Sequence, residues 1–160
     1  MSHTFSKPVL KTLFILYLMA LGYLVFIYQR DIDLSWLVKG DLWVDFENKV
    51  NLIPFKSILS YVQKMNTISG MNVIIENVIA HIVVFSWLGY FLPRLYEKTQ
   101  NLVYFLRIIL VILVSIELVQ FLTQSGLFDV DDILINLVGA YLGFKYLRHI
   151  DDIESGENHG

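Results

Sequence analysis

Apolar residues form four long stretches along this chain, separated by polar segments of unequal length. The stretches run from about residue 9 to 28, 73 to 95, 102 to 122 and 133 to 148. A helix that crosses a bilayer needs about 20 predominantly apolar residues, so each stretch predicts one span, the fourth being the shortest. The pattern predicts an all-α integral membrane protein with about four transmembrane helices, folded as a single domain over residues 1–150.

The segment from residue 30 to 71 is polar but contains the aromatic residues Trp36, Trp43 and Phe46. This mixture predicts an amphipathic segment lying at the membrane interface between helices 1 and 2, with a solvated loop as the alternative. Within it, Pro54 interrupts any continuous helix, so residues 51–55 predict a turn or re-entry. Residues 151–160 are acidic and contain glycine, and they predict a disordered tail.

Composition supports a membrane protein and excludes several other classes. The chain is 56% hydrophobic and contains no cysteine, which excludes disulfides and thiolate metal sites. Its formal charge of −3, with scattered basic residues, argues against a nucleic-acid partner. No small-residue cleavage pattern follows the first apolar stretch, so we expect an uncleaved anchor rather than a removed signal peptide.

The distribution of basic residues predicts the orientation of the spans. With four spans, one side of the membrane receives Lys7, Lys11, Arg94, Lys98, Lys145 and Arg148. The turn from Phe121 to Ile133 on the other side has no Lys or Arg. Because positive residues favour the cytoplasmic side, both termini are predicted to be cytoplasmic. The basic residues of segment 30–71 oppose this orientation, but acidic residues offset them.

Polar side chains inside or beside the spans are the candidate functional residues. A carboxylate such as Glu117 in a membrane helix costs roughly 2.5 to 3.5 kcal/mol on insertion scales, so it usually marks a working site. In the predicted orientation the polar residues of three spans meet at one extracytoplasmic level. We name the following set the polar cluster: His81, Glu117, Gln120, Asp129, Asp132 and Asn136.

Each member of the polar cluster also has a structural interpretation. Asp132 could cap the N-terminus of the fourth helix, and Asp129 and Asp131 could be solvated turn residues. His81 and Asn136 could hydrogen-bond between helices. Separately, Gly139 and Gly143 have the spacing of a close-packing surface, which would bring the fourth span against the third or the second.

The arrangement of these residues resembles that of a known family. Glu117 and Gln120 form E-x-x-Q, and Asp131 begins D-D-x-x-x-N-x-x-G, with the run Asn51-Leu52-Ile53-Pro54-Phe55 upstream. The chain resembles the VanZ-like family, named for a teicoplanin-resistance membrane protein. Many members have asparagine where His81 stands. The resemblance implies a multi-pass protein of the bacterial plasma membrane that lowers susceptibility to teicoplanin-type lipoglycopeptides, and it supplies no reaction.

Three hypotheses about function remain open. In the first, the polar cluster binds or shields an envelope component, so that the partners are membrane lipids and a lipid-linked cell-wall precursor or the lipoglycopeptide itself. In the second, the protein is an intramembrane enzyme acting on such a precursor or on a lipid head group, although the chain has none of the hydrolase or phosphate-loop motifs. In the third, it is a structural partner of envelope proteins. We predict no cofactor and no metal site, although paired carboxylates in an enzyme could hold Mg²⁺.

Overall fold

The computed structural model describes residues 6–28, 32–34, 49–64, 71–72 and 74–157. Helices make up most of these residues, which confirms the all-α fold class. The elements are α1 (Lys7–Phe26), β1 (Val50–Asn51), α4 (Lys56–Lys64), the π-helix η1 (Ile75–Ile79), α6 (Ala80–Leu95), the 3-10 helix η2 (Glu97–Gln100), α7 (Leu102–Leu122), β2 (Phe128–Asp129) and α8 (Val130–Glu157).

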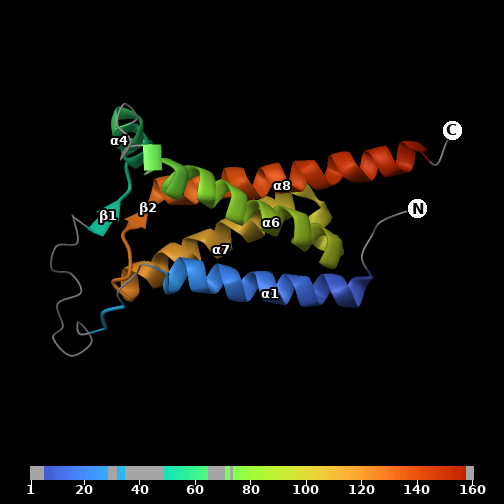
Figure 1. The fold of residues 1–160 in the computed structure, drawn as a ribbon, viewed down its shortest axis with the longest axis horizontal. Coiled ribbons are helices and arrows are strands. Elements are labelled where there is room, and N and C mark those ends of the chain that lie inside the picture. Colours follow the sequence, from blue (N-terminus) through green and yellow to red (C-terminus); the bar gives the residue numbers. More distant parts are fainter. Residues whose placement is uncertain (1–5, 29–31, 35–48, 65–70, 73, 158–160) are drawn as a thin grey trace.

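The long helices α1, α6, α7 and α8 form one elongated bundle (Figure 1). The beginning of α1 and the end of α8 lie at the same end of this bundle, and α4, β1 and β2 lie at the other (Figure 1). We call these the termini end and the α4 end.

Three of the described helices are long and apolar enough to cross a membrane, namely Lys7–Phe26, Asn77–Leu95 and Leu102–Leu122. They correspond to the first three predicted spans, and the third agrees with its predicted limits. The fourth predicted span lies within α8, which has 28 residues but is not among those three helices. The predicted number of four spans is therefore approximate.

The helix α8 is longer than the sequence pattern predicts. It continues through Glu157, whereas we predicted a disordered tail from residue 151, so that prediction is wrong for residues 151–157. Asp151 forms an ion pair with Arg94 of α6 at 3.4 Å, which ties the extended part of α8 to its neighbour. Residues 158–160 lie outside the described residues.

Glycines let the backbones of α6 and α8 approach one another closely. A Cβ atom added to Gly139 would lie 2.6 Å from the carbonyl oxygen of Ile82, and one added to Gly143 would overlap the carbonyl of Ser86. Gly89 of α6 meets the backbone of Ala140 in the same way. The surface formed by Gly139 and Gly143 therefore packs against the second span rather than the third.

Aromatic side chains connect the remaining helices to this pair. The rings of Phe105 in α7 and Phe144 in α8 lie 4.9 Å apart, and Phe14 of α1 lies 5.5 Å from Phe91 of α6. Tyr17 of α1 also donates a hydrogen bond to the carbonyl oxygen of Val84 at 3.0 Å. These contacts fix the four helices around one apolar core.

The segment before α6 folds back onto the beginning of α8. Strands β1 and β2 pair in parallel, with Val50 opposite Phe128 and Asn51 opposite Asp129. A turn follows, in which Phe55 has a φ of 69°, and α4 begins at the next residue. This places a turn at the predicted position. Trp36, Trp43 and Phe46, on which the interfacial prediction depended, lie outside the described residues.

Candidate functional site

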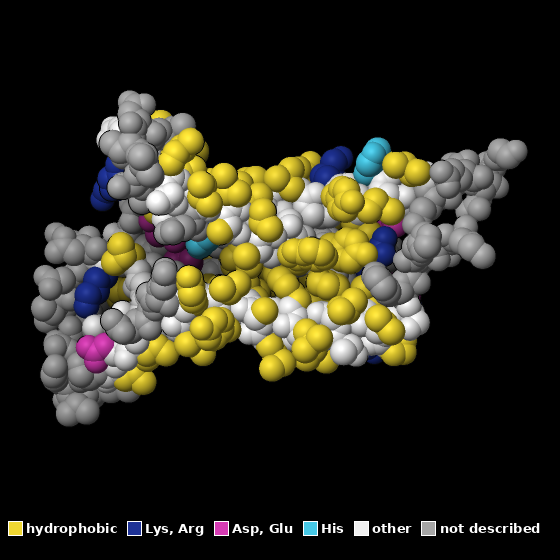
Figure 2. All heavy atoms as spheres, viewed as in Figure 1, with side chains coloured by type: hydrophobic (Ala, Val, Ile, Leu, Met, Phe, Trp, Pro, Cys, Tyr) yellow, Lys and Arg dark blue, Asp and Glu magenta, His cyan; other side chains and the backbone are white. Residues whose placement is uncertain are grey.

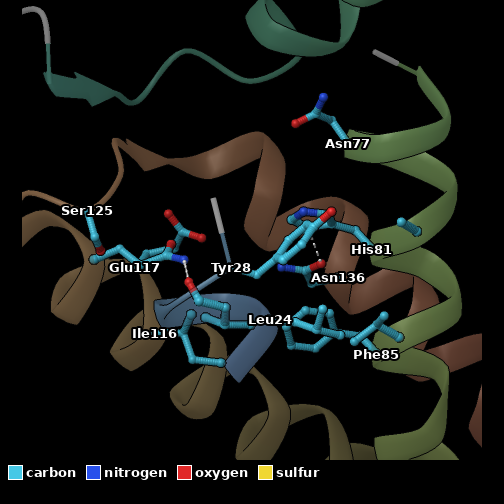
Figure 3. Close-up of a pocket in the computed structure, with 13 residues that line it drawn as sticks. Leu24, Tyr28, Asn77, His81, Phe85, Ile116, Glu117, Ser125 and Asn136 are labelled. Carbon is cyan, nitrogen blue, oxygen red and sulfur yellow. Dashed lines mark hydrogen bonds between the residues drawn. The ribbon is translucent and has the colours of Figure 1, made fainter. Parts of the chain in front are cut away.

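A cavity of about 360 Å³ lies between α1, η1, α6, α7 and α8 toward the α4 end (Figure 3). Its polar lining residues are Tyr28, Asn77, His81, Glu117, Gln120, Ser125 and Asn136, and its apolar ones are Leu24, Val25, Ala80, Val84, Phe85 and Ile116. The lining therefore combines side chains that can form hydrogen bonds with side chains that offer only hydrophobic contact. Four of the six members of the polar cluster line this cavity.

Glu117 is held in the cavity wall near the end of α7. Its side chain is only 2% exposed, and its Oε2 accepts a hydrogen bond from the backbone N–H of Asp129 at 3.1 Å. A buried carboxylate requires such donors because desolvation of its charge is costly. The contact therefore fixes the Glu117 side chain to the turn that precedes α8.

Gln120 lies one helical turn beyond Glu117 and joins α7 to α1. Its Nε2 donates a hydrogen bond to the carbonyl oxygen of Val25 at 2.9 Å. Because a carbonyl oxygen can only accept, this bond defines which end of the Gln120 amide is the nitrogen. The amide oxygen is left as the acceptor end of the side chain.

His81 and Asn136 form the wall of the cavity contributed by α6 and α8. The His81 Nδ1 lies 3.0 Å from the Asn136 Oδ1 (Figure 3). Since Oδ1 accepts, Nδ1 is the protonated nitrogen of this pair, and in a neutral ring Nε2 is then the acceptor. The two side chains form the inter-helix hydrogen bond that the sequence suggested for each of them.

Asp129 contacts Glu117 through its backbone N–H and is buried. Its interpretation as a solvated turn residue is therefore wrong. Its Oδ1 accepts from the Asn51 Nδ2 at 2.9 Å and from the N–H of Asp131 at 2.9 Å, and the Ser57 hydroxyl donates to its Oδ2. Because α8 begins at Val130, Asp129 occupies the N-cap position. The interpretation of Asp132 as the cap is therefore also wrong.

Asp131 caps a different helix from the one that contains it. Its side chain is 0% exposed, and its carboxylate accepts the backbone N–H groups of Phe55, Ser57 and Ile58 at the beginning of α4. An acidic residue at this position neutralises the free N–H groups and the positive end of the helix dipole. Its interpretation as a solvated turn residue is wrong as well.

Asp132 lies in the first turn of α8, is partly exposed and does not line the cavity. Its charge acts instead on Tyr61 of α4. Burial first, and then the carboxylates of Asp132, Asp129 and Asp131, raise the pKa of Tyr61 to about 12. Three aspartates at the beginning of α8 therefore lie close enough to this phenol to disfavour its ionised form.

Sequence reasoning missed several residues of this region. Ser57 was not singled out, yet its backbone and hydroxyl bind two aspartates, and the lining residues Tyr28 and Ser125 were not predicted. Asn51 was recognised only as part of a turn, although it pairs with Asp129.

The described residues contain no group of three or more His, Cys, Asp or Glu side chains arranged to hold a metal ion.

A second depression runs between α1, α6 and α8 and is almost entirely apolar. It has a volume of about 730 Å³ and is lined by Leu10, Leu13, Tyr17, Val83, Ser86, Trp87, Tyr90, Phe91, Gly143, Tyr146 and Ile150. Figure 2 shows hydrophobic side chains covering the middle of the visible face, with acidic and histidine side chains in a recess toward the α4 end. We call the apolar depression between α1, α6 and α8 the apolar groove.

Comparison with known proteins identifies a family. The family model described as VanZ/LLP1 matches residues 14–150, which include every described spanning helix except the beginning of α1. No curated protein matches the chain. No solved structure matches it either.

Proposed function

The chain belongs to the VanZ/LLP1 family, and from this premise we propose that it lowers the susceptibility of a bacterium to teicoplanin-type lipoglycopeptides. In this proposal the cavity at the α4 end faces outward from the plasma membrane. It binds or shields an envelope component, either a lipid-linked cell-wall precursor or the lipoglycopeptide itself.

The combination of polar and apolar side chains in the lining of the cavity is the observation that carries this proposal. Glu117, Gln120, His81 and Asn136 supply polar atoms, whereas Val84, Phe85 and Ile116 supply hydrophobic contact. Ligand pockets combine these two features, and about 360 Å³ lies at the small end of their usual range. The cavity therefore suits the head of an amphiphile and the first part of its chain, rather than a whole lipoglycopeptide.

The apolar groove supports the same class of ligand. It lies along α1, α6 and α8, and the same α1 and α6 also line the cavity. At about 730 Å³ it is large enough for an acyl or prenyl chain. An amphiphile with its head in the cavity could lay its chain along this face of the bundle.

The proposed orientation follows from the positions of the basic residues in the fold. Lys7 and Lys11 lie near the beginning of α1, Arg94 lies near the end of α6 and Lys98 lies in η2, all at the termini end of the bundle (Figure 1). Positive residues favour the cytoplasmic side, so the α4 end and its cavity are assigned to the outside.

The test is the inhibitory concentration of teicoplanin for a susceptible Gram-positive host that expresses this chain. Glu117→Gln removes the charge but keeps an oxygen that can accept from Asp129. Glu97→Gln makes the same chemical change at an exposed position of η2 and serves as the matched control. We expect protection by the unmodified chain and by Glu97→Gln, and its loss in Glu117→Gln. Equal protection by all three at equal expression would show that the cavity is not the site.

An enzyme that acts on a lipid head group is the second candidate. It is favoured by an imidazole oriented by Asn136 in the same cavity as the Glu117 carboxylate, because such a pair can serve as general acid and base. An enzyme leaves a changed lipid or precursor profile in expressing cells, and His81→Gln abolishes that change. A profile that expression leaves unchanged favours the binder.

A further inference from the structure

The outer face of α4 and the turn before it expose large apolar side chains. Their exposed fractions lie between 51% and 65%, and they belong to Leu52, Ile53, Phe55, Leu59 and Val62. Leu59 and Val62 are three residues apart, so they share one face of α4. Exposed apolar side chains gathered in this way mark a surface that contacts another apolar phase.

The opposite face of α4 is attached to the rest of the protein. Ser57 and Tyr61 are partly buried, and the backbone N–H and hydroxyl of Ser57 donate to Asp131 and Asp129. Leu59 is two residues from both Ser57 and Tyr61, and residues two apart lie on nearly opposite sides of an α-helix. The attachment therefore turns Leu59 away from the bundle.

The position of α4 in the fold matches the boundary of a bilayer. The spanning helices α1 and α7 end at the α4 end of the bundle, and α4 lies at their level and to one side of them (Figure 1). Tyr23 and Tyr28, at the same end of α1, are each about half exposed. Tyrosine is enriched where the acyl chains of a membrane meet its head groups. The apolar face of α4 is therefore located at this boundary.

The charges of α4 also suit a membrane interface. Lys56 begins the helix and Lys64 ends it, and both are exposed. A lysine side chain can lie along an apolar surface while its ammonium group reaches the water or the lipid phosphates. With 9 residues α4 is too short to cross a bilayer, so an apolar face with lysines beside it indicates a helix lying in the plane of the membrane.

We propose that Phe55, Leu59 and Val62 immerse α4 in the interface between head groups and acyl chains of the adjacent leaflet. The partner of this surface is thus the lipid bilayer. For residues 52–64 the proposal favours the interfacial segment over the solvated loop, the two alternatives predicted from the sequence. It is independent of the proposed function and of the orientation of the chain, because either leaflet presents such an interface.

Immersion of α4 has a consequence for the cavity. The carboxylate of Asp131 accepts backbone N–H groups at the beginning of α4, and two residues earlier the N–H of Asp129 donates to Glu117 in the cavity wall. The interfacial helix is therefore joined by a short series of hydrogen bonds to the cavity. A helix held at the head groups also sets the level of the cavity in the membrane.

Because the chain has no cysteine, a spin label on a single introduced one can measure the surroundings of α4. Val62→Cys carries the label on the apolar face. Gln63→Cys is the matched control, since residue 63 is the next in the helix, is also exposed and points about 100° away. Val111→Cys, exposed in the middle of α7, is the reference for the hydrocarbon core.

The full chain is reconstituted in vesicles of phosphatidylethanolamine and phosphatidylglycerol. Collisions of each label with oxygen, which concentrates in the bilayer, and with a nickel chelate, which stays in water on both sides, are measured by electron paramagnetic resonance. We expect the oxygen-to-nickel ratio at Val62→Cys to be several-fold above that at Gln63→Cys and below that at Val111→Cys.

Three results would overturn the proposal. Equal ratios at Val62→Cys and Gln63→Cys would mean that water surrounds α4. A ratio at Val62→Cys equal to that at Val111→Cys would place this face in the hydrocarbon core. Few collisions with either reagent at Val62→Cys would mean that protein covers the face, such as a second copy of the chain.

A further pair of variants tests whether the apolar side chains hold α4 at the interface. In the Val62→Cys chain, Phe55→Ser with Leu59→Ser should lower the ratio toward that of Gln63→Cys. Ile153→Ser, an exposed position of α8 at the termini end, should leave it unchanged. Because all three side chains are exposed, these substitutions leave no cavity in the core. An undiminished ratio in the Phe55→Ser, Leu59→Ser chain would also contradict the proposal.

Discussion

The backbone N–H of Asp129 donates a hydrogen bond to the carboxylate of Glu117 at 3.1 Å, joining β2 to the wall of the cavity. The Asp129 side chain in turn binds Asn51 of β1 and Ser57 of α4. A series of hydrogen bonds therefore leads from the segment before α6 to the buried carboxylate of α7. The position of Glu117 depends on residues that are remote in sequence from α7.

Asp131→Asn should release α4 from the bundle. The carboxylate accepts three backbone N–H groups, whereas an amide has a single acceptor oxygen and would direct its own N–H group at some of these donors. Loss of these bonds costs roughly 2 kcal/mol. We expect faster tryptic cleavage at Lys56 and Lys64, which are exposed on α4.

Asp151→Asn provides the control for that experiment. Asp151 forms an exposed ion pair with Arg94 at the termini end, and pairs of this kind contribute about 0 to 1 kcal/mol. Cleavage at α4 should therefore be the same as in the unmodified chain. If Asp131→Asn is equally resistant to trypsin, the capping role assigned to Asp131 is incorrect.

Gly143→Ala should destabilise the contact between α6 and α8. The added methyl group would overlap the carbonyl of Ser86, and neither backbone can move without disturbing its own helix. Overpacking of this kind costs typically about 1 to 3 kcal/mol. The measurement is the midpoint of unfolding in a detergent titration followed by circular dichroism.

Gly22→Ala makes the same substitution where there is room. Nothing lies within 4 Å of a Cβ atom added at Gly22 in α1. Alanine favours a helix over glycine by about 1 kcal/mol, so the midpoint should stay the same or rise. Equal losses of stability in Gly22→Ala and Gly143→Ala would contradict close packing as the cause.

The phenol of Tyr61 should lose its proton at a higher pH than an ordinary tyrosine. Its pKa is raised to about 12 in the folded protein, from 10.0 in the unfolded chain, chiefly by burial and then by the neighbouring aspartates. The neutral form is therefore favoured by folding, and the associated stability is complete below pH 10 and is lost as the pH rises through about 12. An ultraviolet pH titration of the chain and of Tyr61→Phe isolates this phenol.

Asp132→Asn tests the electrostatic part of the Tyr61 shift. Asp132 is the aspartate whose charge contributes most to this shift, so its removal should lower the pKa of Tyr61 toward the ordinary value while leaving the effect of burial in place. A titration curve unchanged by this substitution would contradict the contribution assigned to the charge of Asp132.

The helices were predictable because their signal is local. A predominantly apolar run bounded by Asn101 and Thr123 is sufficient to define α7, and its limits were predicted correctly. The end of α8 was not predictable in the same way. Acidic and polar residues after Arg148 favour a disordered tail by composition, but in the structure Asp151 meets Arg94 and the helix continues.

The roles of the aspartates depend on contacts that the sequence does not display. Asp131 binds residues that are 73 to 76 positions away, and Asp129 pairs with Asn51 at a separation of 78. Without those partners, a run of aspartates in a turn is most simply interpreted as solvated. By contrast, a carboxylate and an amide one turn apart in α7 could be recognised directly, because Glu117 and Gln120 share a face of one helix.

The central claim is that Glu117 of α7 and Asn136 of α8 belong to a single site. The most direct test compares the teicoplanin inhibitory concentration of hosts expressing the unmodified chain, Glu117→Gln, Asn136→Leu and the double variant, at matched membrane levels. If both residues act on one ligand, each single variant loses protection and the double variant loses no more than the more severely affected single variant. Full protection by the double variant would contradict the account.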